Sequence, residues 1–149
     1  QGLPEEQTHG QNIGGGYQHS FGNVKLTIAQ HSSSLPDGSY GGDAAGILIR
    51  AEEKNIYIAG DTGLFSDMQL YKGNGVDLFI VPIGDNFTMG PEDALSAVKL
   101  LEPKLVIPCH YNTWPAIKQN ADVWANRVER EVKHSKVVVL APGGKLVLP

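Results

Sequence analysis

Residues 77–110 have the sequence DLFIVPIGDNFTMGPEDALSAVKLLEPKLVIPCH, in which two short apolar runs flank a segment with helical periodicity. The runs Asp77–Pro82 and Leu105–Cys109 have the length and apolar content of buried strands. A helix is predicted between them, because Pro91 suits the first helical position and Pro103 ends the pattern. Its apolar residues recur at helical spacing, at Ala94, Ala97, Val98 and Leu101. The stretch therefore predicts a strand–helix–strand unit, which is typical of a layered α/β domain.

Further apolar runs are predicted to be strands from their length and residue content. They are Val24–Gln30, Ala45–Ala51, Asn55–Ala59, Lys136–Leu140 and Lys145–Leu148. A polar turn separates the second run from the third, and Ala141-Pro142-Gly143-Gly144 separates the last two, so two hairpins are expected. Gly14–Gly16 is predicted to be a turn before a strand rather than a phosphate loop, because no Lys-Ser/Thr pair follows it.

Two more segments have helical patterns. Over Pro115–Lys133 one apolar stripe is formed by Ile117, Ala121, Trp124, Val128 and Val132. A shorter helix is predicted over Leu64–Tyr71. Because strands and helices alternate and no repeat or linker divides the sequence, residues 1–149 are expected to form a single α/β domain with helices packed on a mixed sheet.

Composition and charge argue against several classes of protein. The 149 residues carry 12 basic and 16 acidic side chains, so the formal charge of −4 and the scattered Lys and Arg disfavour nucleic-acid binding. No apolar run approaches the roughly 20 residues of a bilayer-spanning helix, and the polar, Gly-rich start has no signal-peptide character. The single cysteine, Cys109, cannot form an intrachain disulfide, so a reducing compartment, the cytoplasm, is expected.

Four of the predicted strands are followed by polar residues that can take part in chemistry. They are His31, Asp61, Asp85 with Asn86, and His110. If these strands lie side by side and point in one direction, His31, Asp61 and His110 converge at one edge of the sheet. Two imidazoles and a carboxylate are suitable ligands for zinc, manganese or iron, and a carboxylate such as that of Asp61 can bridge two ions.

Each of these residues also has a purely structural interpretation. His31 precedes three serines and can serve as a hydrogen-bonding loop residue, whereas Asp61 can cap a helix or shape a turn. His110 is the stronger candidate, because the surrounding Pro108-Cys109-His110-Tyr111-Asn112 is crowded with groups that can bind or orient. Three other histidines stand in polar surroundings and are predicted to be surface residues: His9, His19 and His134.

Nucleophilic catalysis by cysteine or serine is not favoured. Cys109 and His110 are adjacent on a strand and point to opposite faces, so they do not form a dyad, and Cys109 is predicted to be a small core residue. The sequence contains no G-x-S-x-G motif, and Ser32–Ser34 lacks the strand–turn–helix context of such a motif. Metal chemistry is therefore the hypothesis that these residues favour.

Four segments, in order along the chain, carry a resemblance to a known family. They are His31-Ser32-Ser33-Ser34, residues 60–68 (GDTGLFSDM), residues 82–91 (PIGDNFTMGP) and residues 108–113 (PCHYNT). Together they resemble the metallo-β-lactamase superfamily, and within it the UPF0173-like branch of small bacterial and archaeal metal-dependent hydrolases. The match extends from about Asn12 to Leu148.

The resemblance implies an αββα sandwich with a binuclear metal site at one edge. His31 matches the family's third-motif histidine, Asp61 its bridging aspartate and His110 its last histidine, so these three are expected to be the catalytic metal ligands. Because lactam-cleaving members carry Cys at the Asp61 position, a general hydrolase is favoured over a β-lactamase. Three further residues are expected close to the ligands or the substrate: Asp85, Asn86 and Asn112. Two divalent ions are implied, with zinc favoured and manganese, iron or nickel as alternatives.

The sequence departs from the family pattern at one point, because it lacks the family's H-x-H-x-D-H motif. Since that motif supplies ligands to both ions, this chain alone offers each ion only two ligands, one of them shared, whereas a catalytic zinc normally has three protein ligands. Strands of the first sheet are missing with it, which would leave an apolar face exposed. Together with a start at Gln1 rather than Met, this predicts the C-terminal part of a longer hydrolase, paired with its missing N-terminal segment or with a second copy of the chain.

The favoured hypothesis for function is a metal-dependent hydrolase, in which metal-activated water attacks an ester, lactone, amide or phosphodiester of a small-molecule substrate. The alternative is a non-catalytic binding or assembly subunit with a degenerate metal site. A self-sufficient mononuclear enzyme that uses His31, Asp61 and His110 is a third hypothesis. The sequence does not identify the substrate, because fold and metal set only the type of chemistry.

Overall fold

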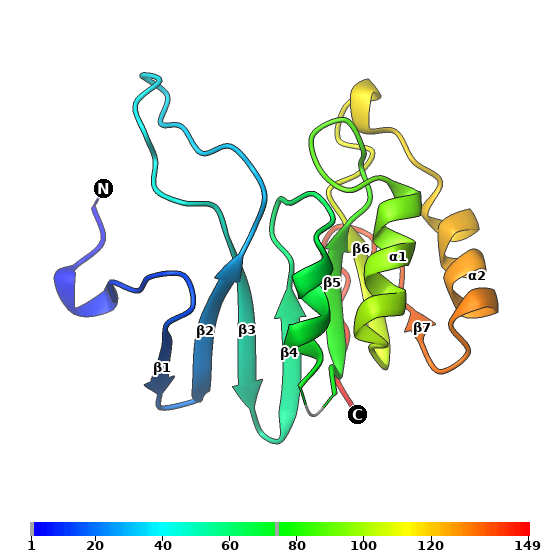
Figure 1. The fold of residues 1–149 in the computed structure, drawn as a ribbon, viewed down its shortest axis with the longest axis horizontal. Helices are drawn as coiled ribbons and strands as arrows, with labels where there is room; N and C mark the ends of the chain where they lie inside the picture. Colours follow the sequence, from blue (N-terminus) through cyan, green and yellow to red (C-terminus); the bar gives the residue numbers. More distant parts are fainter. Residues whose placement is uncertain (1, 74) are drawn as a thin grey trace.

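Within residues 2–73 and 75–149, which the computed structural model describes, seven strands form one sheet in the order in which they occur along the chain (Figure 1). The strands are β1 (Gly16–His19), β2 (Gly22–Ile28), β3 (Ala45–Ala51), β4 (Lys54–Ile58), β5 (Leu78–Pro82), β6 (Leu105–Cys109) and β7 (Lys136–Val137). Neighbouring strands are antiparallel from β1 to β4 and parallel from β4 to β7. The sheet is therefore mixed, as the sequence predicts, and β2, β4, β5 and β6 point in the same direction.

Helices cover one face of this sheet. In Figure 1 the α-helix α1 (Pro91–Leu101) lies in front of β6, and α2 (Ala121–Glu131) lies beside β7 at that end of the sheet. The 3-10 segments are η1 (Glu5–Gln7), η2 (Ser66–Lys72) and η3 (Pro115–Ile117). Beneath them, the fully buried rings of Tyr57 and Phe79 stack with centroids 5.2 Å apart. The buried face of α1 consists of Ala94, Leu95, Ala97, Val98 and Leu101. Because each large apolar side chain contributes about 1.5–3 kcal/mol when it is buried, this layer supplies most of the stability.

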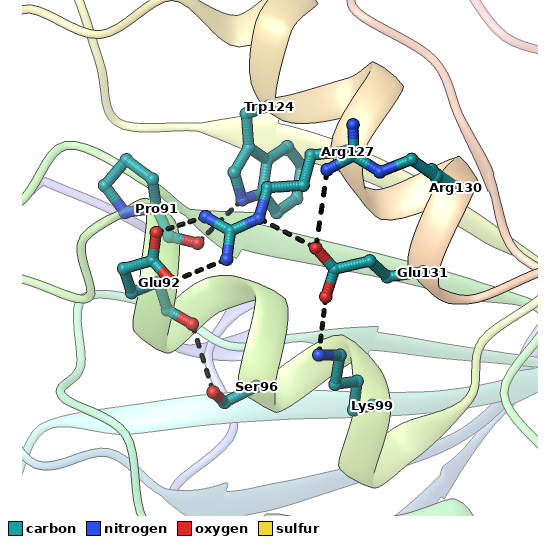
Figure 2. A network of polar contacts seen from close by, with 8 residues as sticks. All are labelled: Pro91, Glu92, Ser96, Lys99, Trp124, Arg127, Arg130 and Glu131. Atoms are coloured by element: carbon teal, nitrogen blue, oxygen red, sulfur yellow. Dashed lines mark hydrogen bonds and ion pairs between the residues drawn. The ribbon is translucent and has the colours of Figure 1, made fainter.

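A polar network joins the outer surfaces of α1 and α2 (Figure 2). The guanidinium of Arg127 donates from Nη2 to Oε2 of Glu92 (2.8 Å) and from Nε to Oε1 of Glu131 (2.9 Å). Lys99 of α1 donates to the other oxygen of Glu131 (2.7 Å), and the indole N–H of Trp124 donates to a carbonyl oxygen at the start of α1 (2.8 Å). Exposed ion pairs contribute little stability individually, but together these contacts hold the two helices in one orientation.

The opposite face of the sheet is apolar and only partly covered. Cross-strand pairing aligns two rows of side chains on it, namely Val24, Ile49, Ile56, Leu78 and Leu105, and Leu26, Ile47, Ile58, Ile80 and Ile107. Apart from the buried Leu78, these side chains keep part of their surface in solvent. The C-terminal segment passes behind the sheet in Figure 1, and Lys54 Nζ donates to the carbonyl oxygen of Pro149. Apolar surface of this extent is typical of a face that packs against further structure.

The hairpin predicted at the C-terminal end is wrong. The strand expected over Lys136–Leu140 ends at Val137, because only its first residues have a partner in β6. The turn at Ala141–Gly144 does form, with the amide of Gly144 donating to the carbonyl oxygen of Ala141 (2.8 Å). The strand expected over Lys145–Leu148 is absent, although residues 145–148 are described. A segment of alternating apolar residues forms a strand only when a neighbouring strand completes its backbone hydrogen bonds. Residues 145–148 instead cross the open face of the sheet.

The helix predicted over Pro115–Lys133 is wrong at its start. Its first residues form the 3-10 segment η3, Lys118 is extended, and α2 begins only at Ala121. The interruption has a local cause, because Asn120 Oδ1 accepts a hydrogen bond from the amide of Val123 (3.0 Å) and caps a new helix there. The shorter helix predicted over Leu64–Tyr71 forms as the 3-10 segment η2.

The other predicted elements agree with the structure to within two residues. Ala45–Ala51 and Leu105–Cys109 form β3 and β6 with the predicted bounds. The strand predicted over Val24–Gln30 extends two residues past the end of β2. The predicted turn at Gly14–Gly16 leads into β1, an edge strand that lacks the apolar pattern needed to predict it. Within the described part of the chain, no helix combines the length and the apolar character that crossing a membrane requires.

Candidate functional site

The polar residues singled out in the sequence all lie at one edge of the sheet. Because β2, β4, β5 and β6 point in the same direction, their carboxyl ends share this edge (Figure 1). His31, Asp61 and Asp85 each follow three residues after the end of β2, β4 and β5, and His110 follows directly after β6. The strand directions that the sequence analysis required for convergence are thus present.

Asp61 and His110 are the pair of candidate ligands that the structure brings into contact. His110 Nε2 lies 3.7 Å from Asp61 Oδ2, and the side chains are 21% and 52% exposed, respectively. The separation exceeds a hydrogen bond, and it is close to the roughly 3.4 Å that tetrahedral geometry gives for two ligand atoms on one zinc ion. Among the described residues, none forms a hydrogen bond with the buried Nδ1 of His110. No structural hydrogen bond therefore accounts for the imidazole at this edge, and its Nε2 and the carboxylate suit a divalent metal.

His110 reaches this position because Gly84 leaves room for it. A Cβ atom at Gly84 would lie 2.1 Å from the carbonyl oxygen of His110 and 3.1 Å from its Nδ1. The backbone of His110 also adopts a left-handed conformation, with φ of 53°, which non-glycine residues rarely occupy. Strained backbone of this kind is often found at functional sites, where the surrounding structure enforces it.

His31 has the hydrogen bonding of a metal ligand but does not contact the pair. Its Nδ1 lies 2.7 Å from the carbonyl oxygen of Ser32. Since a carbonyl oxygen only accepts, Nδ1 is the donor in this contact, which leaves Nε2 as the ring nitrogen that can bind a metal, as in metal-binding histidines. In residues 2–73 and 75–149, no three His, Cys, Asp or Glu side chains come close enough together to hold an ion. The structure therefore assembles Asp61 and His110, with His31 at the same edge outside their contact distance.

Thr62 ties the loops at this edge together. Its buried hydroxyl accepts a hydrogen bond from the amide of Gln30 (2.8 Å), and the amide of Gly63 donates to the carbonyl oxygen of Gln30 (3.0 Å). The amide of Met89, in the loop after β5, donates to the carbonyl oxygen of Thr62 (2.9 Å). Gln30, just before His31, and Thr62, just after Asp61, are thus joined directly by a hydrogen bond. In the sequence, the only sign of this link is that Thr62 follows Asp61.

Asp85, Asn86 and Asn112 shape loops around the pair. All three are exposed and have left-handed backbones, with φ of 65°, 59° and 61°. Asp85 Oδ1 accepts a hydrogen bond from the amide of Asn86 (2.8 Å), and Asn112 Oδ1 accepts one from the amide of Gln119 (2.8 Å). The expectation that they approach ligands or substrate stays a prediction, since their described contacts are to the loops themselves.

Gln119 was not predicted, yet it links two of the loops. Besides its contact with Asn112, its side-chain Nε2 donates to the carbonyl oxygen of Gly84 (3.1 Å). The loops after β5 and β6 are therefore held to each other on either side of His110. No sequence signal marks Gln119, because its role depends on contacts with Asn112 and Gly84, which lie 7 and 35 positions earlier in the chain.

Cys109 has the environment of an unreactive thiol. Burial, with a smaller contribution from the negative charge of Asp61, raises the pKa of Cys109 to about 11. The thiol is therefore protonated at neutral pH, which agrees with the prediction that it is not a nucleophile. The three histidines predicted to be surface residues also fit that description: His9 and His134 are exposed and His19 is partly exposed.

Comparisons with known proteins give a consistent set of similarities. A family model described as a beta-lactamase superfamily domain matches residues 1–111. The chain is 52% identical over 120 residues to a UPF0173 metal-dependent hydrolase of Thermus thermophilus, an overlap that covers 80% of this chain and 54% of the relative. It is 47% identical over 147 residues to a UPF0173 metal-dependent hydrolase of Pelotomaculum thermopropionicum, covering 95% of this chain and 64% of the relative.

A solved structure agrees with these similarities. Igni18, described as a novel metallo hydrolase from the hyperthermophilic archaeon Ignicoccus hospitalis, superposes with a TM-score of 0.80 at 37% identity. The superposition covers 93% of this chain and 59% of Igni18. The chain thus spans between half and two thirds of the length of the proteins to which it is similar.

Proposed function

This chain belongs to the beta-lactamase superfamily domain family, and we propose that it contributes Asp61, His110 and His31 as ligands to the divalent-metal site of a metal-dependent hydrolase. The observation that carries the proposal is the approach of Asp61 Oδ2 to His110 Nε2, 3.7 Å apart, at the edge to which β2 also brings His31. Relatives about half identical to this chain are named metal-dependent hydrolases, which supports the same chemistry.

Two ions are proposed, with zinc favoured, and Asp61 would be the ligand that both ions share. A bound divalent ion supplies a Lewis acid that polarises an ester, lactone, amide or phosphodiester oxygen and lowers the pKa of water toward neutrality. Asp61 is half-exposed and accepts no hydrogen bond from any described residue, so its carboxylate is available to hold a metal and to orient an attacking water. His110 holds its ring beside that carboxylate, and His31 would bind through Nε2, since its Nδ1 contacts the carbonyl oxygen of Ser32.

The open face of the sheet has a place in the same proposal. Its two aligned apolar rows suit a second β layer, and the relatives extend beyond the matched region by a third or more of their length. We propose that the corresponding segment of a longer chain packs there, and with it the remaining metal ligands. Light scattering tests the competing occupant, because a stable dimer of this chain would point to a second copy instead. The single cysteine, Cys109, supports a reducing compartment such as the cytoplasm.

The test is zinc binding to the chain and to matched variants, measured by isothermal titration at zinc concentrations high enough to saturate a site with only two protein ligands. Replacing Asp61 by Ala is expected to weaken zinc binding at least tenfold, because it removes the ligand shared by both ions. Asp67→Ala removes an exposed carboxylate from η2 and is expected to leave zinc binding unchanged. His110→Ala and His134→Ala form a second matched pair. Equal affinity in Asp61→Ala and the unaltered chain would refute the assignment and favour a non-catalytic subunit.

A further inference from the structure

Two aromatic side chains lie next to the candidate site at the carboxyl edge. Phe87 comes from the loop after β5 and Trp114 from the loop after β6. Their ring centroids are 6.2 Å apart with the planes tilted by 52°, and the Trp114 ring meets the His110 imidazole edge-on at 5.9 Å. The two rings thus form one aromatic surface, called the aromatic pair below, that reaches His110.

The aromatic pair is not part of the core. Phe87 is 54% exposed and Trp114 is 45% exposed, whereas Trp124, on α2, is 3% exposed. Single exposed aromatic residues are common on protein surfaces and need no explanation. Two in mutual contact, one of them also against a candidate metal ligand, form a localised apolar surface of the kind that marks ligand-binding sites.

The loops that present the aromatic pair are held in defined conformations. The loop after β5 turns through Asp85, whose amide donates to the carbonyl oxygen of Met89 (3.1 Å). The loop after β6 is closed by the amide of Asn112, which donates to the carbonyl oxygen of Ile117 (2.9 Å). Gln119 then joins the two loops through its contacts described above. Surfaces fixed in advance bind ligands with less loss of conformational entropy, so this arrangement suits a binding role.

An open pocket shares Trp114 with the aromatic pair. It has a volume of about 410 Å³ and is lined by Asn112, Trp114, Pro115 and Lys118. Volumes of this size accommodate small organic groups, and the indole of Trp114 forms a wall shared by the cavity and the aromatic pair. A ligand group in contact with Trp114 can therefore meet both the aromatic pair and this open pocket.

We propose that the aromatic pair binds an aromatic or bulky apolar group of the substrate and so places the adjacent scissile bond beside His110. The proposal rests on the hydrolase function proposed above and narrows its substrate class to esters, amides or related compounds with such a group. Aromatic rings prefer to pack against other rings in offset or edge-on geometry, which the tilted pair offers to an incoming ring.

The test is binding of a neutral aromatic probe, 4-phenylbutanol, to the chain without metal, compared with 1-butanol. The signal is tryptophan fluorescence, because Trp114 is exposed to the probe while Trp124 is buried and serves as an internal reference. A saturable blue shift is expected with 4-phenylbutanol and none with 1-butanol at the same concentration. Phe87→Ala is expected to raise the half-saturating concentration at least fivefold.

The matched control is Phe21→Ala, which removes a ring that is 59% exposed at the turn between β1 and β2. It is expected to leave the half-saturating concentration unchanged, and circular dichroism verifies that both variants are folded. Ligand-observed NMR repeats the measurement with Trp114→Ala, which lacks the fluorescent reporter, and a loss of binding is expected. Equal effects of Phe87→Ala and Phe21→Ala, or equal shifts with both alcohols, would refute the aromatic pair as a binding surface.

The two proposals fail separately. The probe titration contains no metal, so its failure would remove the aromatic surface and leave the zinc measurements on Asp61 untouched. Conversely, unchanged zinc binding in Asp61→Ala alongside normal probe binding would refute the metal site and leave an aromatic binding surface whose chemistry is not hydrolysis.

Discussion

Replacing Gly84 by Ala is expected to destabilise the fold and disturb the candidate site at once. The new Cβ would lie 2.1 Å from the carbonyl oxygen of His110, about 1.2 Å closer than the roughly 3.3 Å at which carbon and oxygen normally meet. Two further contacts of 3.1 Å, with His110 Nδ1 and Ile117 Cβ, prevent the methyl group from moving aside. Because the closest atom belongs to the backbone, β5 or β6 must shift at its carboxyl end.

The cost follows from this geometry. Overpacking in a close-packed interior costs about 1–3 kcal/mol, and a backbone clash places Gly84→Ala near the upper value, at about 3 kcal/mol. For a chain of this size that corresponds to a fall in Tm of roughly 6–12 °C. The displaced imidazole is also expected to weaken zinc binding, since His110 then no longer faces Asp61 at its present distance.

Urea unfolding followed by the fluorescence of the buried Trp124 measures this cost. The control is Gly10→Ala, where the added Cβ has no neighbour within 4 Å, and a change below about 0.5 kcal/mol is expected. If Gly84→Ala unfolds at the same urea concentration as Gly10→Ala, the tight packing of His110 against Gly84 is not a real constraint and the reasoning fails.

Two further predictions concern the helices. Asn120→Ala removes the side-chain cap on the amide of Val123 and is expected to lower the free energy of unfolding in urea by about 1 kcal/mol. Asn120→Asp keeps the acceptor oxygen and is expected to leave this free energy nearly unchanged. Equal losses in both variants would contradict the capping role. Hydrogen bonds from Lys99 and Arg127 lower the pKa of Glu131 from 4.5 to about 2, so the stabilisation is present above pH 4.5 and is lost as the pH falls toward 2. Glu131→Gln is therefore expected to flatten the dependence of unfolding free energy on pH between 5 and 2.5, and an unaltered slope would show that these contacts do not form in solution.

The sequence predicts a helix or strand well when residues adjacent in the chain determine where it begins and ends. Helix α1 begins at Pro91, where the missing amide costs nothing, and β6 is a short apolar run closed by polar residues on both sides. The start of α2 could not be predicted in the same way. The apolar stripe from Pro115 continues across the break, but residues 117 and 119 are used by the loop after β6 through hydrogen bonds to Asn112. A periodic pattern records which residues face the core and does not record such contacts.

The candidate site was predictable to the extent that it depends on strand direction. Asp61 follows β4 and His110 follows β6, the two strands on either side of β5, so their approach depends on β4 to β6 pointing in the same direction. The supports of the site were not predictable, because they arise from tertiary contacts: Gly84 makes room for His110, and Gln119 joins two loops. Glycine and glutamine have no chemical signature that marks these roles in a single sequence.

The different positions of His31 and His110 have a structural cause. His110 directly follows β6, packs against Gly84 and has a left-handed backbone, so short-range packing sets the position of its ring. His31 begins the long excursion between β2 and β3 (Figure 1), and its nearest anchors are the two hydrogen bonds of Gln30. His110 is therefore fixed by packing against Gly84, whereas the position of His31 depends on the hydrogen bonds of Gln30 and on the loop that follows it. Asp61→Ala is accordingly expected to weaken zinc binding more than His31→Ala does, because His31→Ala would leave the Asp61–His110 pair intact for one ion, whereas Asp61→Ala would remove the ligand that both ions share.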